Sequence, residues 1–101
     1  MTEKEKLLEI IYTYGINAQL KKFNEEFFEL IEAIFNYEYE KLDFLNPPSN
    51  KKYVVEEMAD VLVMLEQFKL YYNIKNEDIK KIMDYKIDRQ IKRIEKGIFV
   101  K

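Results

Sequence analysis

Four carboxylates form two matched pairs, and they are the side chains of this sequence best suited to chemistry. Glu26 and Glu29 lie in the run EEFFEL, and Glu57 and Asp60 lie in the run EEMADVL. A spacing of three residues places both acids of a pair on one side of an α-helix, about one turn apart. Four acids from two helices would form a site of hard oxygen ligands, which suits Mg²⁺.

The second pair is the more informative, because it interrupts a helical segment that is apolar almost all the way round. Glu57 and Asp60 would point between apolar and aromatic neighbours, where an ionised carboxylate is costly unless a partner compensates it. That partner is either a metal ion or a Lys or Arg from a neighbouring helix, and the residues leave both possibilities open. We expect Glu56, Glu66 and Gln67 to take the solvated positions, and Val54, Met58, Val61, Leu62 and Leu65 to form one apolar face.

The first pair has an equally simple structural explanation. Glu26 borders an apolar stripe on its helix, and Glu29 lies further round. Taken alone, this is an amphipathic helix with a solvated acidic face, since runs of charge usually lie at the surface. The stripe consists of Leu20, Phe23, Phe27, Leu30, Ile31 and Ile34.

Three cations gather on one flank of the last predicted helix. Lys86, Arg89 and Arg93 could hold a polyphosphate, because guanidinium groups offer planar forks to phosphate and lysine offers a point charge. The alternative is a solvated basic edge, which also fits the preference for positive charge near a helix C-terminus.

Composition removes several classes of function. The chain has 101 residues, enough for one domain, and contains neither Cys nor His. Disulfides, thiolate nucleophiles, Ser-His catalysis, Glu-x-x-His di-iron bundles and the usual zinc enzymes are therefore excluded. Any metal must be held by oxygen. The net charge of −2 shows no broad basic excess and argues neither for nor against a nucleic-acid partner. A nucleic-acid polymer is not among the partners that we expect.

The sequence also predicts no membrane association. The apolar run around residues 58–65 is broken by Asp60 and is far shorter than the roughly 20 residues of a membrane span. The N-terminus MTEKEKLLEI mixes acids and bases, unlike a signal peptide. We expect a soluble, cytoplasmic protein.

Hydrophobic periodicity predicts an all-α fold of four helices, over about residues 2–14, 17–41, 51–73 and 77–96. Thr2 with Glu5 predicts a capping box, and Gly15 and Gly97 predict helix ends. Ser49 or Asn50 is expected to cap the third helix after the Pro47-Pro48 break, and Asn76 the fourth. On the fourth helix we expect Ile79, Met83, Ile87, Ile91 and Ile94 to face the core.

With these elements in place, the sequence resembles a known family. Glu26-Phe-Phe-Glu29, then 27 residues (positions 30 to 56), then Glu57-Met-Ala-Asp60 is similar to the motif of MazG-like all-α nucleoside triphosphate pyrophosphohydrolases. The surroundings QLKKFNEEFFELIEAI and EEMADVLVMLEQ, and the basic stretch KIDRQIKRIEKG, resemble the family's helices. The resemblance covers about residues 16–97 of a single domain spanning residues 1–101.

This resemblance implies a four-helix bundle completed by dimerisation, as a homodimer or a homotetramer. It implies Mg²⁺, with Mn²⁺ as the alternative ion, held by Glu26, Glu29, Glu57 and Asp60 as metal-binding and catalytic residues. It implies cleavage of a nucleoside or deoxynucleoside triphosphate between the α- and β-phosphates, giving a monophosphate and pyrophosphate, with nucleotide-pool housecleaning as one role. Among the acids, Glu29 is our candidate for sharing the roles of base and ligand. The implied phosphate-binding residues are Lys86, Arg89 and Arg93.

A second function from another class is compatible with the same residues. The chain would then be a non-enzymatic helical dimerisation or interaction module, whose acids form structural salt bridges with the basic flank of the fourth helix. The residues that would select a base do not transfer from the family. Candidates are the loop at residues 43–50 and aromatic side chains such as Phe23, Tyr53 and Tyr71, whose default role is core packing.

Overall fold

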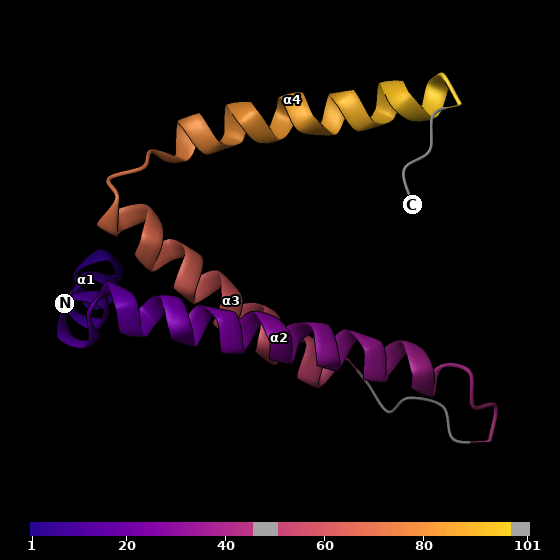
Figure 1. Ribbon diagram of the computed structural model, residues 1–101, viewed down its shortest axis with the longest axis horizontal. Coiled ribbons are helices and arrows are strands. Elements are labelled where there is room, and N and C mark those ends of the chain that lie inside the picture. Colours follow the sequence, from indigo (N-terminus) through magenta and orange to yellow (C-terminus); the bar gives the residue numbers. More distant parts are fainter. Residues whose placement is uncertain (46–50, 98–101) are drawn as a thin grey trace. The chain divides into compact units, whose positions relative to one another are not determined.

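The computed structural model describes residues 1–45 and 51–97, and within these ranges α-helices are the only regular secondary structure (Figure 1). The four α-helices are α1 (Glu3–Tyr14), α2 (Ile16–Glu40), α3 (Lys52–Tyr71) and α4 (Asn76–Glu95). No strand occurs in the described ranges. The predicted all-α class and the order of four helices are therefore confirmed.

The chain falls into two compact units, Met1–Tyr71 and Tyr72–Lys101. The first holds α1, α2 and α3, and the second holds α4. In the first unit α3 packs against both α1 and α2, and α2 and α3 run in roughly opposite directions (Figure 1). That the chain forms one domain stays a prediction.

Local signals at the start of the chain act as expected. Thr2 Oγ1 accepts a hydrogen bond from the Glu5 backbone N–H at 3.1 Å, and the Thr2 N–H donates to Glu5 Oε1 at 3.2 Å. This is the predicted capping box, which satisfies two N–H groups that the helix leaves free. Gly15 ends α1 with φ of 89° and ψ of 153°, a region open almost only to glycine. The chain can therefore turn there and start α2 at once.

The later helix boundaries differ in detail from the sequence prediction. α3 ends at Tyr71, and Asn73 follows with a positive φ of 53°, a conformation that asparagine tolerates. The prediction that Asn76 caps α4 is wrong. Asn76 is the first helical residue, and Lys75 occupies the cap position without a side-chain hydrogen bond. Gly97 follows the end of α4 with φ of 74°, as expected. The predicted caps Ser49 and Asn50 and the Pro47-Pro48 break lie outside the described residues.

The centre of the first unit is small and unusually polar. Its buried apolar side chains are Ile11, Val61 and Met64. Phe23 adds ring contacts to Phe27 and Phe68, with centroids 6.1 and 5.5 Å away. Three polar residues are buried beside this core: Gln19, Glu26 and Gln67.

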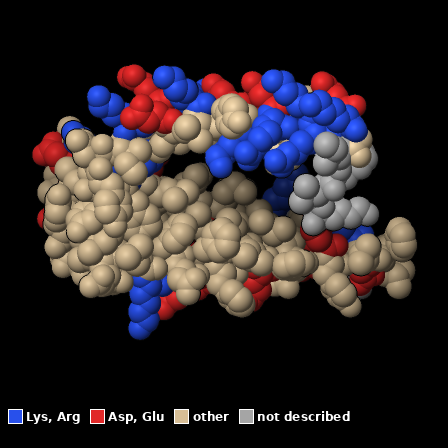
Figure 2. Space-filling model, turned by 45° about the horizontal axis from the view of Figure 1, so that its top comes forward, with Lys and Arg blue, Asp and Glu red and all other residues tan. Residues whose placement is uncertain are grey.

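Much apolar surface of the first unit stays exposed. In Figure 2 its visible side is covered almost entirely by uncharged side chains. Only Val61 of the predicted apolar face on α3 is buried, because Met58, Leu62 and Leu65 are exposed. Helical periodicity places exposed residues of α2 and α3 on one side of the helix pair, opposite the side that carries Asp60. We call this set the apolar face: Leu20, Phe27, Ile31, Ile34, Met58 and Leu65.

Helix α4 is described by itself. None of its described residues is buried, as expected for a single helix without a core of its own. The expectation that Ile79, Met83, Ile87, Ile91 and Ile94 face a core therefore stays a prediction. No helix in residues 1–45 or 51–97 is long and apolar enough to cross a membrane.

Candidate metal centre

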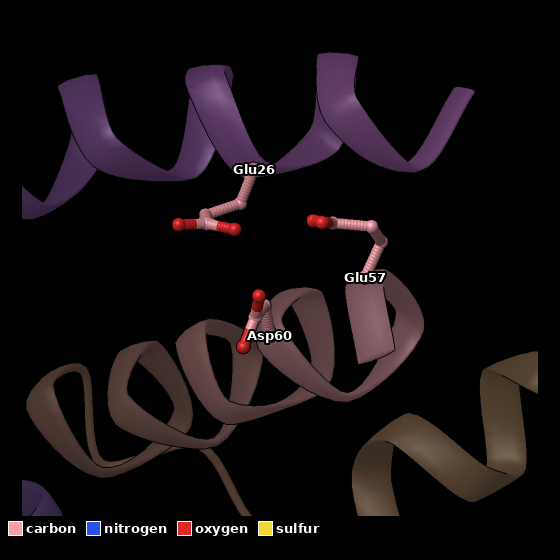
Figure 3. A group of neighbouring side chains, drawn as sticks. All are labelled: Glu26, Glu57 and Asp60. Carbon is pink, nitrogen blue, oxygen red and sulfur yellow. The ribbon is translucent and has the colours of Figure 1, made fainter. Parts of the chain in front are cut away.

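Three of the four predicted acids come together between α2 and α3. Glu26 projects from α2, and Glu57 and Asp60 project from α3 one turn apart (Figure 3). Each residue offers one carboxylate oxygen, and these three oxygens lie within 4.8 Å of one another. Side chains 31 and 34 residues apart in sequence, from Glu26 to Glu57 and from Glu26 to Asp60, thus converge on one point.

The acid cluster, as we call Glu26, Glu57 and Asp60, contains oxygens without a hydrogen-bonding partner. Glu26 is only 8% exposed, so the alternative of a solvated acidic face is wrong for this residue. Glu26 Oε2 and Glu57 Oε2 are both buried, and among the described residues neither accepts a hydrogen bond. A buried acceptor without a donor costs free energy, and more so when it carries charge. Two buried oxygens of the cluster therefore have no hydrogen-bond donor among the described residues.

Neighbouring acids also raise the cost of ionising Glu57. The pKa of Glu57 is raised above its ordinary value, first because burial desolvates the carboxylate. The negative charges of Glu29, Asp60 and Glu26 raise it further, and a hydrogen bond with Glu29 adds to the effect. A divalent cation among these oxygens would reverse this repulsion, because it would become the largest local charge.

Among the described residues of the first unit, one cation forms an ion pair with the cluster. Lys22 Nζ lies 3.2 Å from Glu26 Oε1, one turn away on α2. The hydrogen bond and the charge of Glu26 raise the pKa of Lys22. Within the described part of Met1–Tyr71, neither Glu57 nor Asp60 takes part in an ion pair. Inside this unit the salt-bridge alternative therefore finds no cation for these two acids.

Glu29 lies outside the group of three but close to Glu57. It is exposed, and it acts on the pKa of Glu57 through both charge and hydrogen bonding. Glu29 and Glu57 line a hollow of about 350 Å³, which Tyr53 and Tyr37 also border. The fourth predicted acid therefore stands beside the cluster, next to open space.

The three predicted phosphate ligands lie on α4. Their spacing places Lys86, Arg89 and Arg93 on one side of that helix. The Arg89 guanidinium carbon lies 5.8 Å from the centroid of the Tyr85 ring, a distance typical of a cation–π contact. Because α4 belongs to the second unit, their role as phosphate ligands stays a prediction.

A larger cavity of about 520 Å³ adjoins the acid cluster, and it holds residues that the sequence analysis missed. Gln67, expected to be solvated, is only 2% exposed, and Gln19 is 6% exposed. One signal could have revealed both. Gln19 precedes Glu26 by seven residues and Gln67 follows Asp60 by seven, which is two helical turns and thus nearly the same side of each helix. The lining residues are Ile10, Tyr14, Ala18, Gln19, Lys22, Glu26, Asp60, Val63, Met64 and Gln67.

The aromatic candidates for base recognition have different surroundings. Phe23 packs against Phe27 and Phe68, and Tyr71 faces Tyr12 with ring centroids 6.1 Å apart.

Comparisons with protein-family models, with curated proteins and with solved structures found no match to this chain.

Proposed function

We propose that this protein is a Mg²⁺-dependent nucleoside triphosphate pyrophosphohydrolase of the MazG-like type. It would cleave a nucleoside or deoxynucleoside triphosphate between the α- and β-phosphates, releasing a monophosphate and pyrophosphate. One observation carries the proposal. Carboxylate oxygens of Glu26, Glu57 and Asp60 lie within 4.8 Å of one another, and buried oxygens of Glu26 and Glu57 lack a hydrogen-bonding partner.

The donor set fits the ion. Carboxylate oxygens are the ligands that Mg²⁺ prefers, and Mn²⁺ accepts the same set. Glu26, Glu57 and Asp60 would hold the ion, with Glu29 completing the site from beside Glu57. When bound, the ion would offset the repulsion between these acids and a triphosphate and stabilise charge on the transferring phosphoryl group.

The remaining chemistry falls to side chains of the chain itself. Since there is no His, the attacking water would be activated by the metal ion, by a carboxylate that accepts its proton, or by both. Glu29 is the candidate, because it is exposed and stands beside Glu57. The water oxygen forms a bond to phosphorus, the bridging P–O bond breaks, and the pyrophosphate leaves with the bonding pair. Lys86, Arg89 and Arg93 would neutralise the charge of the departing pyrophosphate.

The proposal includes self-association. A second copy of the chain would cover the apolar face, since exposed apolar patches of this kind mark interaction sites. A homodimer would bury it once, and a homotetramer would pair two such dimers. Association would also supply the enclosure that a unit with three buried apolar residues, Ile11, Val61 and Met64, lacks.

Phosphorus NMR tests the reaction class directly. The protein is incubated with Mg²⁺ and a panel of standard and modified nucleoside triphosphates, and the products are read as monophosphate plus pyrophosphate. Asp60→Asn should lower turnover by about 100-fold or more, since loss of residues that merely support metal ligands already costs 10–100-fold. Glu56→Gln is the matched control, because Glu56 is exposed and lies 4.0 Å from Lys52 on α3. Release of inorganic phosphate, or full activity in Asp60→Asn, would contradict the proposal.

The apolar face also supports the second function, a non-enzymatic dimerisation module. In that case no nucleotide is turned over, and the acids are held by basic side chains. Neutralising Glu57 or Asp60 would then lower stability, because it breaks pairs. For a metal site without its ion the sign is opposite, since neutralisation removes repulsion among carboxylates. Thermal unfolding of Glu57→Gln in the presence of EDTA separates the two.

A further inference from the structure

Two buried glutamines, Gln19 and Gln67, line the cavity beside the acid cluster. Gln19 Nε2 donates to Gln67 Oε1 at 2.8 Å, joining α2 to α3 across the interior. Both side chains are more than nine-tenths buried, and both line the cavity of about 520 Å³. A buried pair of amides is therefore in contact with a space large enough for a small molecule.

The hydrogen bonds of this pair are incomplete. Each Nε2 has Met64 Sδ at 3.9 Å as its other neighbour, and a thioether is a weak acceptor. Gln19 Oε1 accepts no hydrogen bond from any described residue. The pair thus leaves the Gln19 carbonyl oxygen without a partner among the described residues, and three of its four N–H bonds have no acceptor stronger than Met64 Sδ. Two apolar side chains would fill the same space without this cost.

We propose that the Gln19–Gln67 pair binds the polar edge of a nucleobase, and so determines which nucleotide enters the site. This rests on the proposed function, which supplies a nucleotide as the substrate. An amide oxygen and amide N–H groups that lack strong partners match the adjacent donor and acceptor that nucleobases present on their Watson–Crick edges. Neither a sugar nor a phosphate chain presents that planar pattern.

The spacing between the amide pair and the acid cluster supports this assignment. Gln19 and Glu26 are two turns apart on α2, and Asp60 and Gln67 are two turns apart on α3. Two turns span about 10 Å along a helix. That length is comparable to the separation between the base edge and the phosphates of an extended nucleotide. A base on the amides would thus place its phosphates near the acids.

The other walls of the cavity suit a flat, partly apolar ligand. Ile10, Val63 and Met64 line it with apolar surface, and Tyr14 adds an exposed ring. Aromatic rings stack on nucleobases in a way that tolerates different sequences or bases. The amides would then supply selectivity, while the walls supply contact area.

Nucleoside binding tests the inference without requiring turnover, metal or phosphate. Side-chain amide signals are followed by ¹⁵N NMR in EDTA, with adenosine, cytidine, guanosine, uridine and thymidine as probes and ribose as the blank. We expect at least one nucleoside, but not ribose, to shift the signals of Gln19 and Gln67. The double variant Gln19→Leu/Gln67→Leu should weaken that binding about tenfold or more, whereas Asn24→Leu, an exposed amide on α2, should not change it.

The possible outcomes separate this inference from the proposed function. If the preferred nucleoside binds equally well to the double variant, or if no nucleoside shifts the amides, the inference is wrong whatever the enzyme activity. If the double variant does not fold, Gln67→Glu provides the test. This variant keeps an acceptor for Gln19 Nε2 but replaces the N–H groups of Gln67 Nε2 by a carboxylate oxygen. It must therefore change the order of preference among nucleosides, and an unchanged order overturns the proposal.

Discussion

In the acid cluster, the Glu57 carboxylate is held where its neighbouring acids oppose its ionisation. Glu57 shows this most clearly, because burial, Glu29, Asp60 and Glu26 all act in the same direction on its pKa. Lys22 offsets only part of the charge, through Glu26. At the scale of single residues, the proposed cation would supply the positive charge that these acids lack within the described part of the first unit.

The raised pKa of Glu57 predicts a specific pH dependence. Folded protein binds this proton more tightly than the unfolded chain, whose value is near the ordinary 4.5. The stability contributed by protonated Glu57 is thus complete below 4.5 and is lost as the pH rises through the higher, folded pKa. In EDTA, the thermal midpoint of the wild type should fall over this window relative to Glu57→Gln. Parallel pH profiles for the two proteins would contradict the prediction.

At Glu57, the proposed metal site predicts the opposite effect on the thermal midpoint when Mg²⁺ is present. Millimolar Mg²⁺ should raise the midpoint of the wild type near neutral pH, because a ligand that binds only the folded state stabilises it. Glu57→Gln should gain little. Lowering the pH should weaken the effect in the wild type, since protons compete with the ion for the carboxylates.

Lys22 should behave as a substitute cation for the metal. Lys22→Met removes the ammonium beside Glu26 and should lower the thermal midpoint in EDTA, since Glu26 is buried and loses its ion pair. With Mg²⁺ present the difference should shrink, because the ion takes over the role of the ammonium. Lys21→Met, at the exposed neighbouring position, is the control. A deficit of equal size with and without Mg²⁺ would show that Lys22 has a purely structural role.

Helices are the scale at which the sequence was most informative, because their signals are local. The capping box at Thr2 and the stop at Gly15 depend on residues a few positions apart, and periodicity indicated all four helices. Burial was harder to predict. Gln67 is buried by a partner 48 residues away, and on α3 only its seven-residue spacing from Asp60 distinguishes it from a solvated glutamine. Asn76 failed as a cap because α4 begins one residue earlier than expected.

Gly15 is the element-scale position most sensitive to substitution. Its φ of 89° and ψ of 153° join α1 directly to α2, and α1 supplies the buried Ile11 and the cavity residues Ile10 and Tyr14. Gly15→Ala should cost about 1–3 kcal/mol of unfolding free energy from backbone strain, measured by urea denaturation. No neighbouring atom lies within 4 Å of the added Cβ, so a steric clash would not explain the loss. An unchanged midpoint would contradict this backbone conformation.

At the scale of the whole molecule, the apolar face and helix α4 both leave large apolar side chains exposed. The apolar character of α3 indicated a partner from sequence alone, but which residues stay exposed became clear only once α2 and α3 were paired. The acids of α2 and α3 converge within one unit, whereas Lys86, Arg89 and Arg93 belong to the other. The proposal that these cations act together with the acids therefore rests on the resemblance to MazG-like enzymes.

Association through the apolar face gives a test at this scale. Ile31→Glu places a charge on the face and should convert an oligomer to a monomer, because an unpaired charge cannot be buried cheaply in an apolar interface. Tyr39→Glu introduces the same charge on α2, at an exposed position that helical periodicity places about 80° or more round the helix from every α2 residue of the apolar face. Sedimentation velocity distinguishes the species. A monomeric wild type, or an Ile31→Glu variant that stays oligomeric, would contradict the assignment of this face.

The central claim is that a divalent cation binds among Glu26, Glu57 and Asp60. Titration with Mn²⁺, followed by electron paramagnetic resonance of the free ion, measures that binding without any assumption about substrate. The account predicts saturable binding to the wild type and to Glu56→Gln, and its loss in Asp60→Asn while far-ultraviolet circular dichroism shows the helices intact. A wild type that binds no Mn²⁺, or an Asp60→Asn variant that binds it equally well, would contradict the account.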